Sequence, residues 1–218
     1  MIFKRSAPYI FGVLALSAMS ISHASASAIT TYTGTLTGDD QTQEFTWTLT
    51  QNSQVVLSTD SYGGGTMNGV MTPAGGFVPV ISIFNASTGV LVASDGADGV
   101  CQGGMNKDSV THMCDDAYLS LKLSAGNYIL ALGEFFNVPI GPNLSDGFLE
   151  QGQGNFTAQT CGTSGPFWQT DIAPCVQRDG SFTLNAAAVP EPGTLWLALP
   201  AILLGVIRRR RGASELSN

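Results

Sequence analysis

Basic residues are scarce in this 218-residue chain once its two ends are set aside. Of nine lysines and arginines, only Lys107, Lys122 and Arg178 lie between residues 27 and 189, against fourteen of the sixteen acidic residues. The formal charge of this stretch is therefore −11, compared with −7 for the whole chain. Such an acidic surface repels a phosphate backbone, so nucleic acid is not an expected partner. The charge suits solubility or cation binding outside the cell.

Histidine is also scarce, and this limits the chemistry that the chain can perform. The sequence has two histidines, and His112 is the one that lies beyond the first 26 residues. A zinc site, or a Ser-His-Asp or Cys-His arrangement, would have to use it. His112 stands between two cysteines, and no C-x-x-C spacing occurs. We therefore interpret His112 as a loop residue and expect that the protein is not an enzyme.

Long apolar runs are missing, and the two short ones lie near the chain ends. Residues 10–16 (IFGVLAL) follow Lys4 and Arg5 and precede small residues that include Ala24-Ser25-Ala26. A charged region, a short apolar core and an A-x-A site are typical of a secretory signal peptide. We expect residues 1–26 to be such a peptide, cleaved after export across the inner membrane; an N-terminal membrane anchor is the alternative.

The second short run, residues 193–207, contains Pro200. At about 1.5 Å per residue its 15 residues span roughly 22 Å of a hydrocarbon core about 30 Å thick, and proline would kink the helix. This segment predicts membrane contact that is temporary rather than permanent. Four arginines follow it and would stay on the cytoplasmic side by the positive-inside rule: Arg208, Arg209, Arg210 and Arg211.

The residues before this run, Val189, Pro190, Glu191 and Pro192, favour an extended backbone, because proline disfavours helix for the residue before it. This motif, the apolar run and the arginines resemble the PEP-CTERM sorting signal of Gram-negative bacteria, here residues 189–212. The resemblance implies an exosortase-type membrane processing enzyme as partner and transient anchoring at the membrane. Transfer to the cell surface or release would follow, often in bacteria that make an exopolysaccharide matrix. A plain C-terminal membrane anchor is the alternative.

All four cysteines lie in the part of the chain that would be exported, where an oxidising compartment favours disulfides. Four cysteines allow three pairings. We expect Cys101 to pair with Cys114 and Cys161 with Cys175, because each pair brackets a polar, glycine-rich stretch typical of a long loop. Zinc binding is the alternative, and it lacks the usual ligand spacing.

Between its ends the chain predicts strands and no amphipathic helix. Residues 44–50 (EFTWTLT) place Phe45, Trp47 and Leu49 on one face and threonines on the other. With 26 glycines in the chain, this pattern predicts an all-β fold, a single β-sandwich over residues 27–188. Similar short segments recur along the chain: residues 30–37, 54–59, 78–84, 90–93, 117–123, 127–132, 156–159 and 181–185.

The order of several of these segments resembles the bacterial pre-peptidase C-terminal (PPC-like) domain, a small jelly-roll-like β-sandwich. The resemblance covers about residues 42–186 and departs from the usual form in long insertions at 101–114 and 138–175. It implies the fold and an accessory, non-catalytic role, and it transfers no active site. The stretches that carry it are residues 81–85, 89–91, 94–98, 116–121 and 123–130.

Acidic residues gather near the first cysteine pair. Asp95, Asp98 and Asp116 offer oxygen ligands at turns, which calcium requires. Asp95 and Asp98 are three residues apart, so the stretch is not an EF-hand loop. We interpret these residues as solvated acidic turns and expect no cofactor. Weak calcium binding at Asp95, Asp98 and Asp116 is the alternative.

Aromatic residues in the glycine-rich loops define the remaining candidates. Exposed rings on a β-sandwich could stack on sugars, whereas buried ones would form small satellite cores. The expected function is that of a non-catalytic exported protein of the cell surface or exopolysaccharide matrix, with extracellular polysaccharide as a partner. A calcium-dependent or carbohydrate-binding module and a hydrolase with an unrecognised site are the alternatives. The aromatic candidates are Tyr62, Phe77, Phe135, Phe136, Phe148, Phe167 and Trp168.

Overall fold

The computed structural model describes residues 27–170 and 172–191, which belong to one compact unit. Eight strands form two four-stranded antiparallel sheets, which confirms the predicted all-β sandwich. In strand order, the first sheet consists of β1 (Ala28–Thr35), β12 (Ser181–Pro190), β3 (Ser53–Asp60) and β8 (Tyr118–Leu123). The second consists of β2 (Thr42–Leu49), β9 (Gly126–Glu134), β6 (Pro79–Asn85) and β7 (Leu91–Asp95).

The core lies between the two sheets and follows from the alternation of side chains along each strand. On β2, Trp47 and Leu49 are buried while Thr46 and Thr48, which alternate with them, are exposed, because successive side chains of a strand point to opposite faces. They join Leu57 from the first sheet and Ile83 and Leu130 from the second in one apolar cluster. Burying each large apolar side chain stabilises the fold by roughly 1.5–3 kcal/mol.

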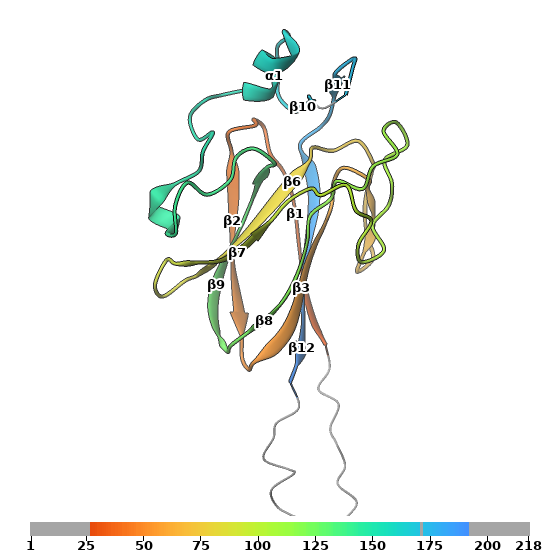
Figure 1. Ribbon diagram of the computed structural model, residues 1–218. Coiled ribbons are helices and arrows are strands. Elements are labelled where there is room, and N and C mark those ends of the chain that lie inside the picture. The colour runs from red at the N-terminus through yellow and green to blue at the C-terminus, as the bar shows by residue number, and fades with distance from the viewer. Residues whose placement is uncertain (1–26, 171, 192–218) are drawn as a thin grey trace, which may run out of the picture. The chain divides into compact units, whose positions relative to one another are not determined.

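Both ends of the described chain lie at the same end of the sandwich (Figure 1). Ala28 at the start of β1 pairs with Ala188 near the end of β12. Beyond it, Pro190 pairs with Ser53, and the N–H of Glu191 donates to the Asn52 carbonyl at 3.0 Å. The first three residues of the predicted sorting motif therefore continue the last strand. The predicted signal peptide, Pro192, residues 193–207 and the arginine cluster lie outside the described residues.

Smaller elements extend from the sheets. A hairpin of β4 (Gly65–Met67) and β5 (Val70–Thr72) follows β3, and a short 3₁₀ helix covers Leu144–Asp146. The helix α1 (Phe156–Cys161) and the pair β10 (Trp168–Gln169) and β11 (Val176–Gln177) lie at the end of the sandwich opposite the chain ends (Figure 1). No helix among the described residues is long and apolar enough to cross a membrane.

The strand predicted at residues 156–159 is wrong, because these residues form α1. Tertiary contacts explain the difference. Buried Asp39 accepts hydrogen bonds from the N–H and hydroxyl of Thr157 in the first turn, satisfying a helix N–H group that lacks an internal partner. Gly162, in the left-handed region with φ of 64°, ends the helix and donates back to Ala158 and Gln159. The alternation of apolar and polar residues at 156–159 predicts a strand, and these four residues alone cannot show that Asp39 and Gly162 favour a helix.

Candidate functional site

Both predicted disulfides are confirmed. Cys101 pairs with Cys114 and Cys161 with Cys175, with Cα–Cα distances of 5.0 and 6.1 Å. The first bridge closes part of the connection between β7 and β8, and the second closes part of the connection between β9 and β12. We call residues 101–114 and 161–175 the first and second disulfide-closed loops.

Arg178 joins the two disulfide-closed loops. Its guanidinium makes a bidentate ion pair with Asp108 of the first loop, at 2.9 and 3.1 Å, and both groups are buried. It also donates to the side-chain oxygen of Gln169 on β10 and lies 4.4 Å from the ring centre of Tyr62. The Arg178 guanidinium and the Thr111 N–H hold the pKa of Asp108 below its usual range against the opposing effect of burial. This buried network fixes the relative positions of the loops.

The seven loop aromatics divide into two groups. Tyr62, Phe77, Phe148 and Phe167 are buried, as the satellite-core interpretation expects. Phe135 and Trp168 are half-buried, and 49% of the Phe136 surface is exposed. All three residues line the same pocket, although Trp168 lies 33 residues after Phe135 in the sequence.

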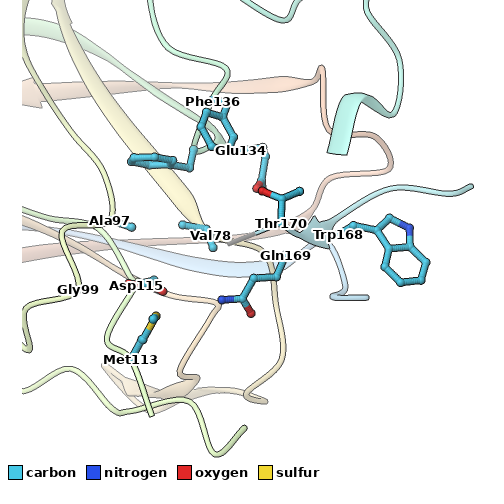
Figure 2. A pocket seen from close by; sticks show the side chains of 11 residues that line it. Val78, Ala97, Gly99, Met113, Asp115, Glu134, Phe136, Trp168, Gln169 and Thr170 are labelled. Carbon is cyan, nitrogen blue, oxygen red and sulfur yellow. The ribbon is translucent and has the colours of Figure 1, made fainter. Parts of the chain in front are cut away.

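The pocket has a volume of about 310 Å³ and opens between the two loops and the end of the second sheet (Figure 2). Its volume lies at the lower end of the range of roughly 300–1,000 Å³ typical of small-molecule sites. It therefore has room for one small ligand. The lining residues come from five segments of the chain: Val78 before β6; Ala97 and Gly99 after β7; Met113 and Asp115 at the end of the first loop; Glu134, Phe135 and Phe136 at the end of β9; and Trp168, Gln169 and Thr170.

Glu134 is the most unusual group in this pocket. It is the last residue of β9, only 5% of its surface is exposed, and its Oε2 has no hydrogen-bond partner. In Figure 2 its side chain reaches toward Thr170, whereas the indole of Trp168 is directed away from the other lining side chains. A buried polar atom without a partner costs about 1–3 kcal/mol. Such an atom beside a cavity indicates a place where a ligand could supply the missing hydrogen bond.

The backbone around Glu134 is fixed on both sides. The N–H of Phe135 donates to the Val78 carbonyl at 2.9 Å, and the N–H of Asn137 donates to the Glu134 carbonyl at 2.8 Å. Buried Asn137 in turn donates to the Asp40 carbonyl and accepts from the N–H of Glu150. Burial raises the pKa of Glu134 well above its usual value, and the charge of Asp39 raises it further. The acid is therefore protonated over a wider pH range than a surface glutamate.

The structure does not gather the three residues of the predicted calcium site. Asp116 is buried and accepts from Thr59 and from the N–H groups of Ser61, Tyr62 and Gly63. Burial raises its pKa to about 6, against the lowering effect of these donors.

Asp95 and Asp98 lie at a separate turn. Asp95 ends β7 and is half-buried, and Asp98 is exposed and accepts from Val100 and Gln102. Over residues 27–170 and 172–191, no group of three or more His, Cys, Asp or Glu side chains is arranged to hold a metal ion. His112 is an exposed loop residue whose N–H donates to the Asp108 carbonyl, as its sequence context predicts.

Comparison with family models, with curated proteins and with solved structures finds no match to this chain. The functional argument therefore depends on the pocket itself. Sequence reasoning named the three bordering aromatics but missed Glu134 and Arg178. Arg178 carried one available signal, because it is one of three basic residues in a strongly acidic domain.

Proposed function

We propose that this is a non-catalytic exported protein that binds a saccharide unit of extracellular polysaccharide in the Glu134 pocket. The observation that carries the proposal is an unpartnered buried carboxyl oxygen beside a cavity bordered by Phe135 and Phe136. A sugar ring presents apolar C–H faces and polar hydroxyl edges. An aromatic wall and a fixed polar group supply complementary contacts for both.

The polar part of the pocket supports a neutral, hydroxyl-bearing ligand. A protonated Glu134 both donates and accepts, so its carboxyl group can pair with a hydroxyl that also does both. Gln169 offers an amide in the same pocket, and its side chain is fixed by Arg178 on one side and Tyr62 on the other, the latter at 2.6 Å. Such fixed groups lower the entropic cost of binding.

The position of the pocket fits presentation at a surface. The described chain begins and ends at one end of the sandwich, and α1 and β10 lie at the opposite end (Figure 1). The pocket end of the sandwich is therefore remote from Glu191, the last described residue, where the predicted sorting signal continues. We propose from that motif, the apolar run and the arginines after it that an exosortase-type enzyme sorts the protein to the cell surface or the exopolysaccharide matrix.

Replacing Phe136 with alanine should weaken saccharide binding by roughly five- to tenfold, because it removes part of the apolar wall. Titration of the exported domain with neutral monosaccharides and oligosaccharides, followed by calorimetry or tryptophan fluorescence, measures this change in affinity.

Glu134→Gln should retain saccharide binding, since an amide also donates and accepts, whereas Glu134→Ala should lower the affinity about tenfold or more. Wild-type binding should weaken as pH rises through the raised pKa of Glu134, and Glu134→Gln should remove that pH dependence.

Ile140→Ala is the matched control, because it removes an exposed apolar side chain outside the pocket lining. Equal binding by wild type, Phe136→Ala and Glu134→Ala would reject the pocket as the saccharide site. Cleavage of an oligosaccharide during the titration, lost in Glu134→Gln, would instead identify a hydrolase and overturn the non-catalytic proposal.

The sorting proposal predicts that the mature exported protein lacks Trp196 to Asn218. Replacing Pro190 and Pro192 with alanine should leave a longer species retained at the membrane. Mass spectrometry of membrane and secreted fractions from a host with an exosortase distinguishes the two forms. An intact C-terminus on the mature protein would support a plain membrane anchor. The exposed ion pair between Lys122 and Glu191, at 2.7 Å, offers a control, because Lys122→Ala should not change processing.

A further inference from the structure

A second pocket lies where β3 ends and shares no lining residue with the saccharide pocket. Its volume is about 270 Å³, and its lining is mainly polar. Ser58 and Asp60 come from β3, Thr66 and Met67 from the hairpin that follows, and residues 103–106 from the first loop. Tyr118, the first residue of β8, closes another side.

Asp60 supplies the carboxylate of this pocket, and no ion pair in the described part of the chain satisfies it. Only 4% of its surface is exposed, and its Oδ2 has no hydrogen-bond partner. The position of its carboxylate depends on Gly65, since a Cβ there would lie 2.6 Å from both oxygens. An ionised carboxylate in such a place is costly unless a partner pairs with it. The free oxygen therefore points to a ligand rather than to a completed structural contact.

No basic side chain of the described residues neutralises this region through an ion pair. The ion pairs found within residues 27–170 and 172–191 are Lys122 with Glu191 and Arg178 with Asp108. Asp116 lies close enough for the charge of Asp60 to raise its pKa. Two neighbouring acids without a cation would both gain from a positive charge in the pocket.

The donor set favours a singly charged organic cation over a metal ion. The oxygens of Asp116 are occupied by Thr59 and three backbone N–H groups, which leaves Asp60 as the carboxylate with a free oxygen. Calcium affinity depends on the number of charged ligands, and one carboxylate is few. The cavity is also much larger than a bare ion. Met67, Met105 and the Tyr118 ring border it and could contact an aliphatic chain.

We propose that this pocket binds a ligand carrying a primary ammonium group, with Asp60 as its counter-ion and the Met67, Met105 and Tyr118 walls around its carbon chain. Three N–H donors of an ammonium match the carboxylate oxygen together with the hydroxyls of Ser58 and Thr66. The site is separate from the saccharide pocket, so failure at one leaves the other untouched.

The test compares pentylammonium with 1-pentanol, which has the same chain without the charge, by NMR titration of the exported domain. Pentylammonium should bind and pentanol should bind at least about tenfold more weakly, because a charge-assisted hydrogen bond is lost. Asp60→Asn should reduce pentylammonium binding by a similar factor. Asp98→Asn is the control, because that acid is exposed, precedes the first disulfide-closed loop and lies outside the pocket lining.

If Asp60→Asn does not fold, contacts between pentylammonium and the wild-type protein test the proposal instead. Nuclear Overhauser effects should link the alkyl protons of pentylammonium to the methyl groups of Met67 and Met105. Their absence at saturating ligand overturns the proposal. Equal binding of pentanol, unchanged binding in folded Asp60→Asn, or displacement of the amine by calcium at equal or lower concentration would overturn it as well.

Discussion

Replacing Arg178 with methionine is expected to lower the free energy of unfolding by about 3–5 kcal/mol, the usual cost of breaking a buried ion pair from one side. The substitution leaves Asp108 buried without its cation and removes the donors to Gln169. It also removes the contact with the Tyr62 ring. Denaturant unfolding of the exported domain at neutral pH measures the change.

The double variant Arg178→Met/Asp108→Leu tests the physical reason. It should be less destabilised than Arg178→Met alone, since apolar side chains of similar volume often replace a buried ion pair at little cost. Lys122→Met is the matched control and should change stability little, because its ion pair with Glu191 is exposed to water. An Arg178→Met variant as stable as wild type would show that the two loops are held without this network.

The same substitution should affect the saccharide pocket through Gln169. Arg178 holds the Gln169 side-chain oxygen, and the Gln169 amide donates to the Tyr62 hydroxyl, so the amide orientation is fixed from two sides. Without the guanidinium, Gln169 can rotate. Arg178 is thus a positioning residue for the proposed site, and folded Arg178→Met should bind saccharide more weakly while keeping the pH dependence conferred by Glu134.

Features encoded locally were predictable from the sequence. The alternation around Trp47 and Leu49 predicts β2, because the side-chain period of a strand is two and one face of the sheet is buried. The two disulfides were predictable for a related reason. Each cysteine pair brackets a loop of a size that one bridge can close. The pairing could therefore be predicted without any knowledge of the fold.

Features that depend on contacts distant in sequence were not predictable. Glu134 is 95 residues from Asp39, whose charge contributes to its raised pKa, and nothing around it in the sequence marks it as buried. The strand predicted at residues 156–159 failed in the same way, because Asp39 stabilises the first turn of α1 from another part of the chain. The sequence identified the accessible aromatics as candidates, but their burial, which separates Phe136 from Phe148, depends on the packed loops.

Removing either disulfide should cost about 2–5 kcal/mol of unfolding free energy, close to the value of about 3 kcal/mol expected for loops of this length. The bridges close sequence separations of 13 and 14 residues. Paired cysteine-to-serine variants at 101 and 114, and separately at 161 and 175, allow each bridge to be measured by denaturant unfolding. Non-reducing peptide maps should show the remaining bridge intact in each variant.

The combined variant that lacks both bridges carries more information, because Arg178 couples the two loops. Loosening the first loop frees Asp108, and loosening the second frees Gln169, so either change weakens the same network. The two costs should therefore be non-additive by about 0.5–3 kcal/mol, as expected for groups that share partners. In an Arg178→Met/Asp108→Leu background the costs should become additive within about 0.5 kcal/mol. Additive costs in the wild-type background would show that the loops are independent, and the buried ion pair would then not be the element that joins them.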